Sequence, residues 1–258
     1  MTEYLKQKFG LCGKSALVTG ASRGIGRAVA LALAQSGASV AVHYQRSKEK
    51  AEEVVKEIIK MGGQSWSVPA DLSDANGSKE LIDRVKEQWE HLDILVNNAG
   101  DMVNRRPLLQ ASNNWIETVL RVNLHSTLYV TRDALPLLLK GRLPAVINTS
   151  SISAHNGGVG GVSVYAAAKG AILSLTRSMA RELAPTVRVN AIAPGVILTD
   201  LHNRLSTQAG LESLAQQTPL KRNGQPEECA SAVVFLSSDA SSFITGQVIE
   251  INGGLWMG

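Results

Sequence analysis

The stretch TGASRGIG (Thr19–Gly26) places three glycines between an apolar run and an amphipathic one. The run SALVTG (Ser15–Gly20) is typical of a short buried strand, and the residues that follow, up to Gly37, have the periodicity of a helix that ends at glycine. A helix that begins just after a strand points unpaired N–H groups and the positive end of its dipole at the loop between them. Because glycines let a phosphate approach the backbone there, the stretch predicts a dinucleotide-binding loop.

Strand and helix patterns alternate along the whole chain of 258 residues. Strands are expected at 15–20, 38–44, 65–72, 92–100, 145–151, 187–195 and 247–253, and helices at 25–37, 47–63, 78–91, 113–139 (bent near Pro136), 164–184 and 226–236. Strands separated by long helices form right-handed βαβ units with a parallel sheet. We therefore expect an α/β protein of one domain (1–258): a Rossmann-type, doubly wound parallel sheet of about seven strands with helices on both faces. The polar segment 198–225 predicts a substrate lid.

Composition and charge exclude several classes of function. The net charge is +4, but the basic residues are scattered, which argues against a nucleic-acid partner. The apolar runs are too short to span a membrane, and the first ten residues, MTEYLKQKFG, lack the apolar core of a secretion signal. The His and Cys residues show no metal-ligand spacing. We expect a cytoplasmic protein without a metal site.

The end of the second expected strand indicates which nicotinamide cofactor is preferred. An Asp or Glu at this position binds the ribose 2′-hydroxyl in folds that prefer NAD. The segment HYQR (His43–Arg46) has no acid, whereas Arg23 and Arg46 flank the expected ribose position. The two guanidinium groups favour a 2′-phosphate and hence NADP(H). His43 itself is expected to be a packing or surface residue.

The motif YAAAK places Tyr165 and Lys169 on one face of a helix, because residues four apart are neighbours there. A nearby ammonium favours the phenolate and is expected to lower the pKa of the tyrosine. Such a tyrosine can exchange a proton with a carbonyl or alcohol oxygen. The fifth strand ends in NTSS, so Ser150 or Ser151 could hydrogen-bond the same oxygen from the carboxyl edge of the sheet.

Together these motifs resemble those of the short-chain dehydrogenase/reductase family in its compact form, over essentially the whole chain. The matching segments are TGASRGIG, the AD that ends at Asp71, NNAG (Asn97–Gly100), YAAAK, PGVILTD (Pro194–Asp200) and ITGQVIEINGG (Ile244–Gly254).

The resemblance implies a catalytic set of Asn123, Ser151, Tyr165 and Lys169. Tyr165 is then the acid/base, Lys169 lowers its pKa and holds the nicotinamide ribose, and the serine steadies the substrate oxygen. Asn123 matches the asparagine whose site in the helix holds a water of the proton relay. Ser151 precedes the tyrosine by one position more than the family's serine usually does, and we choose it because it follows the strand.

The resemblance also implies the residues that contact cofactor and substrate. Those expected at the cofactor are Gly20, Ser22, Arg23, Gly24, Ile25, Gly26, Tyr44, Arg46, Ser47, Asp71, Leu72, Asn97, Ala99, Gly100, Tyr165, Lys169, Pro194, Gly195, Ile197 and Thr199. Those expected at the substrate are Ser153, His155, Val159 and Val196.

The implied reaction is hydride transfer between NADP(H) and a ketone or secondary alcohol. The motifs are most similar to those of 3-oxoacyl-thioester reductases. Relatives of this kind dock an acidic carrier on basic residues near the mouth of the site, for which Arg142 is a candidate, but Pro185–Thr186 stands where a basic residue is common and argues against docking of an acyl carrier protein.

Two other functions stay open at this point. The chain could reduce small or cyclic ketones or sugars, or it could bind NADP(H) as a sensor or scaffold without catalysis. The family also implies a homotetramer that packs the helices carrying Asn123 and Tyr165 against their symmetry mates.

Overall fold

Seven parallel strands form one sheet in the computed structural model, which describes residues 2–200 and 206–258. The spatial order is β3-β2-β1-β4-β5-β6-β7. The strands are β1 (Ser15–Val18), β2 (Ser39–Tyr44), β3 (Ser65–Pro69), β4 (Ile94–Asn97), β5 (Ala145–Thr149), β6 (Arg188–Pro194) and β7 (Val248–Ile251). Every neighbouring pair is parallel, which confirms the predicted class of fold.

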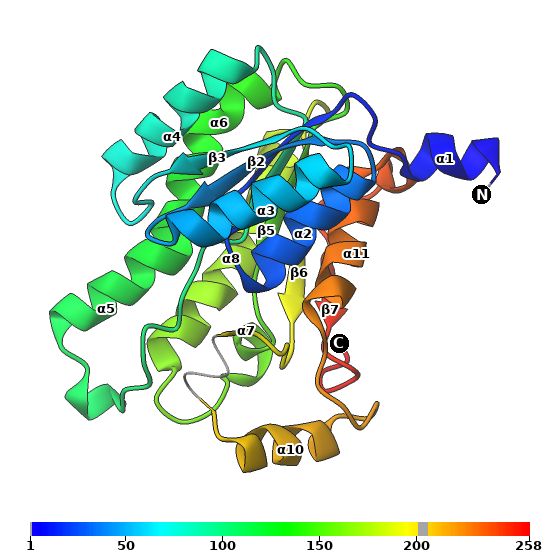
Figure 1. The fold of residues 1–258 in the computed structure, drawn as a ribbon. Coiled ribbons are helices and arrows are strands. Elements are labelled where there is room, and N and C mark those ends of the chain that lie inside the picture. Colours follow the sequence, from blue (N-terminus) through cyan, green and yellow to red (C-terminus); the bar gives the residue numbers. More distant parts are fainter. Residues whose placement is uncertain (1, 201–205) are drawn as a thin grey trace.

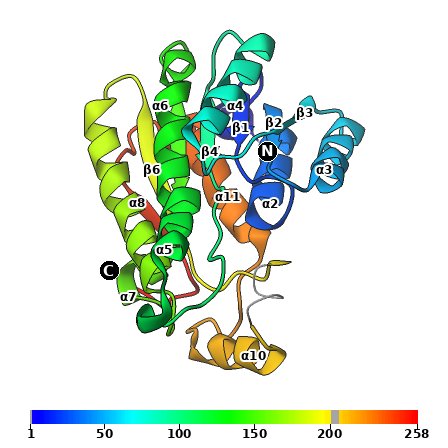
Figure 2. The same cartoon turned by 90° about the vertical axis from the view of Figure 1, so that its left-hand side faces the viewer.

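Helices cover both faces of the sheet (Figure 2). One face carries α2 (Gly24–Gln35), α3 (Lys48–Lys60) and α11 (Pro226–Ser237), and the other carries α4 (Ala75–Gln88), α6 (Ser126–Leu138) and α8 (Ser163–Glu182). The strand β1 shows why both faces are covered, since Ala16 and Val18 belong to one buried cluster and Leu17 to the other. Strands that are apolar on both sides are typical of parallel sheets between two helical layers.

The strand order reverses between β1 and β4, which places a crevice at their carboxyl ends. The chain leaves β1 toward β2 and β3 on one side, and returns to β4 and the later strands on the other. The short helix α7 (Ser153–Asn156) and the helix α10 (Gln208–Gln217) lie at this carboxyl edge, toward which the arrowhead of β6 points (Figure 1). The fold thus places the site at this edge.

The long helix expected at 113–139 contains an irregular turn that the sequence pattern did not indicate. It consists of α5 (Asn113–Leu120), a π-helical segment (Arg121–His125) and α6. The helix α6 continues past Pro136 to Leu138, and the irregular turn is centred on Asn123, a position that the sequence pattern did not indicate. Insertions of this type are frequent at functional sites.

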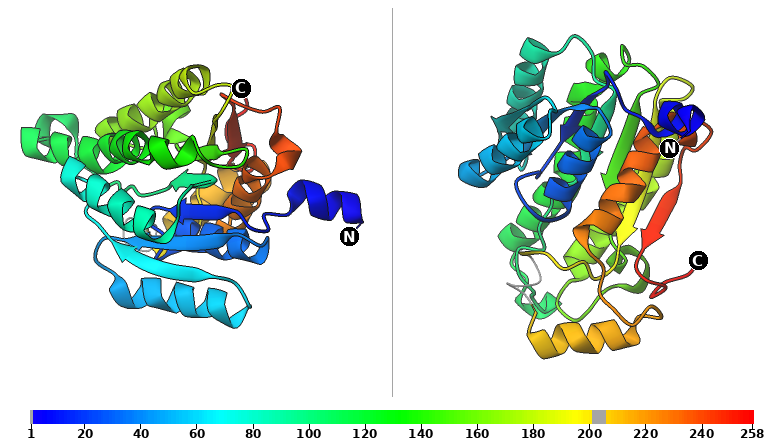
Figure 3. Two further views of the ribbon diagram at one scale, coloured as in Figure 1. Left: turned by 90° about the horizontal axis from the view of Figure 1, so that it is seen from above. Right: turned by 45° about the vertical axis from the view of Figure 1, so that its right-hand side comes forward.

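Two further details differ from the sequence-based expectation. The helix α1 (Glu3–Phe9) was not expected and extends from the body of the molecule, as the views in Figure 3 show. Its Phe9 ring lies 6.3 Å from the ring of Phe235 on α11. The segment 198–225 is not irregular throughout, because it contains α10, and its residues 201–205 lie outside the described residues. In the described ranges, no helix is long and apolar enough to cross a membrane.

Candidate active site

The glycine loop between β1 and α2 takes a backbone path that needs its glycines. Gly20 and Gly24 have φ values of +63° and +56°, in the left-handed region that other residues rarely adopt. At Gly26 a Cβ would overlap the carbonyl oxygen of Gly20 and would lie 2.5 Å from Nδ2 of Asn98. The loop can therefore close tightly on itself and leave its outer side open to a ligand.

The start of α2 has the properties of an anion site. Arg23 is its N-cap residue, and no side chain of the described chain caps the first N–H groups. These donors and the helix dipole are available to a phosphate. Ser22 and Ile25 are half-buried beside them, and Arg23 is exposed.

Asp71, Gln45 and Arg46 come together where β2 and β3 end. Burial disfavours the charged form of the Asp71 carboxylate, but hydrogen bonds from Ser73 and Gln45 and the charge of Arg46 outweigh this effect and lower its pKa. Arg46 is exposed, so its guanidinium is accessible to a ligand that reaches the end of β2. The three side chains could bind the ribose and base of a dinucleotide.

Tyr165, Ser151 and Lys169 form a second cluster at the carboxyl edge. The hydroxyls of Ser151 and Tyr165 are hydrogen-bonded to each other. Lys169 lies on the same face of α8, with its Nζ 5.7 Å from the centre of the Tyr165 ring. Nζ donates to the carbonyl oxygen of Thr149 at 2.9 Å, at the end of β5. The end of β5 and the helix α8 together thus position the ammonium group of Lys169.

The pKa of Tyr165 departs from the direction expected from the sequence. Burial raises it, and Asp101 raises it further, while the hydrogen bond with Ser151 acts in the opposite direction. Burial lowers the pKa of Lys169 to about 8, because the charged amine loses solvation. The expected lowering of the tyrosine pKa is therefore wrong, since burial and the charge of Asp101 together exceed the effect of the hydrogen bond with Ser151. A protonated tyrosine suits proton donation.

Asn123 approaches this cluster from the π-helical segment. Its side chain is fully buried, and Nδ2 donates to the carbonyl oxygens of Asp101 at 2.7 Å and Val119 at 2.9 Å. Its Oδ1 has no hydrogen-bond partner among the described residues. A Cβ at Gly100 would lie 2.8 Å from this Oδ1 and 3.2 Å from Nζ of Lys169. The missing side chain at Gly100 thus leaves space beside both polar atoms.

The structure separates the two serines that follow β5. The Ser150 hydroxyl donates to the carbonyl oxygen of Lys169 at 2.8 Å and is buried. The Ser151 Oγ accepts from the backbone N–H of Ser153 at 3.1 Å and contacts Tyr165. Ser151 is the serine that lies at the tyrosine, despite its extra position in the sequence.

The residues expected at the cofactor surround the same crevice, but some have side chains that point into the protein. Buried side chains, which leave only backbone atoms for a ligand, belong to Tyr44, Leu72, Asn97, Pro194 and Ile197. The Nδ2 of Asn97, for example, donates to Thr131 at 2.8 Å and Asn148 at 3.0 Å inside the molecule. Thr199 packs close to Gly24, so the segment after β6 reaches the glycine loop.

Of the residues expected at the substrate, Ser153 and His155 belong to α7, Val159 follows this helix and Val196 follows β6, and their side chains differ in exposure. Val159 is exposed, and Ser153 and Val196 are half-buried. The His155 ring is already engaged, because its Nε2 lies 2.8 Å from Oε1 of Glu250 and the ring stacks on Trp256 at 5.1 Å. His155 therefore ties α7 to the end of the chain.

Arg142 lies at the wrong edge of the sheet for a residue at the mouth of the site. It belongs to the loop that precedes β5, its guanidinium donates to the carbonyl oxygen of Gly13, and its N–H donates to Asp93 at 2.6 Å. These partners precede β1 and β4, at the amino edge. The expectation that Arg142 borders the site is incorrect within this chain.

Sequence reasoning missed three residues that hold the glycine loop. Asn98 donates from Nδ2 to the carbonyl oxygens of Thr19 at 2.9 Å and Gly20 at 3.1 Å. The Thr19 hydroxyl accepts from the N–H groups of Asn98 and Ala99. His43 is the third, since its Nδ1 accepts from the N–H of Gly20 at 3.0 Å. For Asn98 a signal existed, because side chains alternate along a strand, so the two adjacent asparagines of NNAG point toward opposite faces of the sheet.

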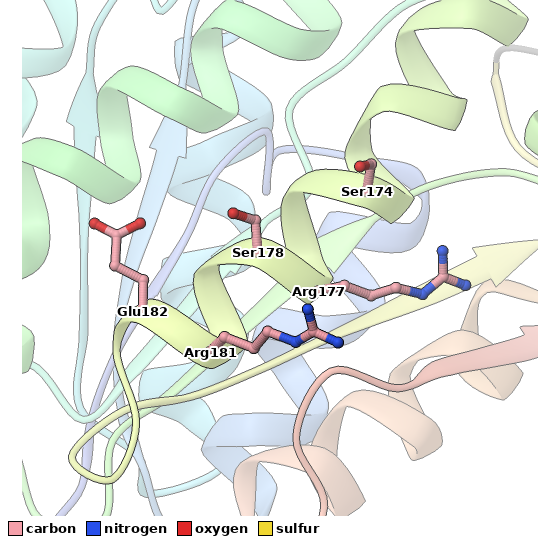
Figure 4. Close-up of a pocket in the computed structure, with 5 residues that line it drawn as sticks. All are labelled: Ser174, Arg177, Ser178, Arg181 and Glu182. Atoms are coloured by element: carbon pink, nitrogen blue, oxygen red, sulfur yellow. The ribbon is translucent and has the colours of Figure 1, made fainter.

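A separate surface hollow lies on the outer face of α8 (Figure 4). Its lining side chains all project from the second half of this one helix and are Ser174, Arg177, Ser178, Arg181 and Glu182. Tyr165 is more than two turns away along α8, so the hollow is distinct from the site. In the part of the chain that the structure describes, no group of His, Cys, Asp and Glu could hold a metal ion.

The sheet, the glycine loop and the grouped Ser151, Tyr165 and Lys169 define a Rossmann-type protein with a candidate acid–base site. A family model described as enoyl-(acyl carrier protein) reductase matches residues 20–256. The chain belongs to the short-chain dehydrogenase/reductase family, and it is an oxidoreductase.

Known proteins resemble the chain over nearly its whole length. The 3-oxoacyl-(acyl-carrier-protein) reductase FabG of Staphylococcus aureus is 44% identical over 245 residues, which are 95% of this chain and 98% of that protein. A gluconate 5-dehydrogenase of Burkholderia cenocepacia, solved with NADP and tartrate, has a TM-score of 0.90 and 32% identity, covering 97% of this chain and 98% of its own. A 7α-hydroxysteroid dehydrogenase, solved with NADH and a 7-oxo bile acid, has a TM-score of 0.92 and 33% identity, covering 98% of both chains.

Proposed function

We propose that the chain is an NADP(H)-dependent reductase of 3-oxoacyl thioesters, with Tyr165 as the proton donor. The observation that carries the chemistry is the hydrogen bond between Tyr165 and Ser151 beside the ammonium of Lys169. The similarity to FabG, at 44% identity over 95% of the chain, supports the class of substrate.

The described residues fit a dinucleotide. The uncapped start of α2 and the cradle at Gly26, which a side chain would fill, would hold the pyrophosphate. Asp71 would bind the adenosine end, and Lys169 would donate to the nicotinamide ribose. The unpartnered Oδ1 of Asn123, in the space beside Gly100, would accept from a water there.

The cofactor, when bound, supplies the hydride for the carbonyl carbon. Ser151 donates a hydrogen bond to the carbonyl oxygen and fixes its position. Tyr165 transfers its phenolic proton to this oxygen as the negative charge develops. The charge of Lys169 stabilises the phenolate that remains, and a water held at Asn123 can return a proton to it. Reduction therefore consumes one proton, which enters through Tyr165.

The preference for NADP(H) rests on Arg46 and Arg23. Both guanidinium groups are exposed, at the end of β2 and at the start of α2. Arg46 lies close enough to Asp71 to lower its pKa, so it is at the adenosine end of the crevice. Two cations favour a 2′-phosphate there. The related gluconate 5-dehydrogenase was solved with NADP, which is consistent with this choice.

The segment 198–225 is proposed to close over the substrate within a single domain. Ile197 and Gly224 form a β-bridge that joins the two ends of the segment. The Nζ of Lys50 on α3 lies 3.2 Å from Oδ2 of Asp200. This ion pair joins the beginning of the segment to the cofactor side of the crevice. Residues of this segment would then exclude water from the carbonyl.

A cytoplasmic homotetramer is the proposed assembly. The helix pair formed by α5–α6 and α8 carries Asn123 and Tyr165, and α8 exposes small and basic side chains along its outer face, including the hollow of Figure 4. Light scattering at micromolar concentration measures the assembly, and a monomer would contradict this part of the proposal.

The test of the function is consumption of NADPH and of NADH, followed by absorbance, with a panel of carbonyl compounds. The panel contains a 3-oxoacyl thioester, a small ketone, a cyclic diketone and a keto sugar acid. We expect NADPH-dependent turnover of the thioester. Turnover of the other compounds alone would discard the thioester assignment, and binding of NADPH without any turnover would indicate a sensor or scaffold.

A further inference from the structure

His43 is a buried histidine that the proposed reaction does not use. It lies on β2, between β3 and β1, and is 2% exposed. Its Nδ1 accepts a hydrogen bond from the N–H of Gly20 at 3.0 Å, and its Nε2 lies 3.1 Å from the carbonyl oxygen of Ala70. Its own carbonyl oxygen accepts from the N–H of Ala21 at 2.8 Å. One residue therefore holds two successive amides of the glycine loop.

The partners determine the protonation of the ring. A backbone N–H can only donate and a carbonyl oxygen can only accept, so Nδ1 is unprotonated and Nε2 carries the hydrogen. The ring is neutral and uses both nitrogens. Burial lowers the pKa of His43 to about 4, against smaller opposite effects of Ala70 and Asp71, which agrees with a neutral ring.

The two bonds join the two ends of the cofactor crevice. Gly20 is the first glycine of the phosphate loop, and Asn98 holds its carbonyl oxygen at 3.1 Å from the other side. Ala70 directly precedes Asp71, at the end expected to bind adenosine. The imidazole thus links the glycine loop after β1 to the segment after β3 that carries Asp71.

We propose that His43 is a positioning residue that holds the Gly20 peptide in the orientation that binds the cofactor pyrophosphate. The inference rests on the proposed binding of NADP(H). Without the ring, the N–H of Gly20 loses its acceptor and the left-handed turn at Gly20 can reorient. Ordering of the glycine loop would then cost free energy when the cofactor binds, and this cost weakens the affinity for NADPH.

Three variants separate the two hydrogen bonds. In His43→Asn the side-chain amide reaches about as far as Nδ1 and can accept from Gly20. In His43→Gln the amide reaches about as far as Nε2 and can donate to Ala70. His43→Phe keeps a ring and removes both bonds. Val40→Ala is the matched control. Val40 is also fully buried on β2, but its side chain is apolar and cannot hydrogen-bond the glycine loop.

The readouts are the Kd for NADPH by fluorescence titration, kcat at saturating NADPH, and the free energy of unfolding. We expect His43→Asn to bind NADPH within about threefold of the wild type and the Gln and Phe variants to bind about tenfold more weakly or worse. We expect kcat to change less than about threefold, because the catalytic side chains are untouched.

Two outcomes would overturn the inference while leaving the proposed function intact. One is equal NADPH affinity in all His43 variants and the wild type. The other is a loss of affinity in Val40→Ala as large as in His43→Phe, since this would assign the effect to general loosening of β2. If the wild type bound neither NADPH nor NADH, the proposed function itself would fail.

Discussion

The Nζ of Lys169 lies 5.7 Å from the centre of the Tyr165 ring, one helical turn along α8. Burial acts on the two groups in opposite directions, lowering the pKa of Lys169 to about 8 and raising that of Tyr165. At neutral pH Lys169 is therefore mostly charged, and Tyr165 keeps its phenolic proton. These are the states needed for a proton donor and for the cation that stabilises its conjugate base.

Replacing Tyr165 by Phe removes only the hydroxyl that contacts Ser151. We expect turnover to fall by about 10²–10⁴, the usual contribution of a positioned acid. The Kd for NADPH should change less than about threefold, because the glycine loop is untouched. Kinetics with the active substrate of the panel and fluorescence titration of NADPH measure both. Retained turnover would show that another group supplies the proton.

The pKa of Lys169 predicts an alkaline limit for reduction. As pH rises through about 8, the lysine loses its proton and no longer stabilises the phenolate of Tyr165. The profile of kcat/KM should therefore fall above this value. In Lys169→Met, kcat/KM should be low and should lack this alkaline limb, the decrease above about pH 8. Lys79→Met, which changes an exposed lysine on α4, is the control that should keep the wild-type profile. An unchanged limb in Lys169→Met would assign the titration to another group.

Gly100→Ala places a methyl group 2.8 Å from Oδ1 of Asn123 and 3.2 Å from Nζ of Lys169. We expect kcat to fall about tenfold or more, since either the two polar groups shift or the space for a water between them is lost. Gly160→Ala is a suitable control, because nothing lies within 4 Å of its Cβ position among the described residues. Similar kinetics in both variants would show that the space beside Gly100 is not used.

Arg46→Ala tests the discrimination between the two cofactors. Loss of a cation that pairs with a phosphate costs about tenfold or more in affinity. The Kd for NADPH should rise by this factor, and the Kd for NADH should stay nearly constant, because NADH lacks the 2′-phosphate. Arg84→Ala, at an exposed position of α4, should change neither value. Equal effects on both cofactors would place Arg46 away from the 2′-phosphate.

The sequence predicted the parallel sheet and the glycine loop because both depend on local patterns. Alternating strand and helix periods identify the βαβ units, and Gly20 and Gly24 stand where the backbone takes positive φ values. That Tyr165 and Lys169 share one face of a helix follows from their spacing. Such features need no knowledge of distant contacts.

Other features could not be derived because they depend on residues far apart in the chain. The π-helical turn places Asn123 against the backbone of Asp101, 22 positions away. The direction of the Tyr165 pKa depends on burial, which the spacing to Lys169 does not reveal. His43 resembles any strand residue until its partners, 23 and 27 positions away, are known.

The neutral ring of His43 predicts a specific loss of stability in acid. Its pKa is about 4 in the folded chain and about 6.5 when unfolded, so between these values the unfolded state binds more protons. The free energy of unfolding should therefore decrease as pH falls from 6.5 to 4, by about 3 kcal/mol from this residue. Asp71 is the acidic group whose charge acts on the ring, and it opposes this trend only in part.

Urea unfolding at several pH values measures this loss, with His43→Asn as the comparison because its amide does not titrate. Between pH 4 and 6.5, the free energy of unfolding should depend less on pH in His43→Asn than in the wild type. Above pH 7 the two proteins should show the same pH dependence. Long-range ¹H–¹⁵N NMR should show the wild-type ring with the hydrogen on Nε2 down to about pH 5. A ring that gains its second proton near 6.5, or that carries the hydrogen on Nδ1, would contradict the bond to the N–H of Gly20.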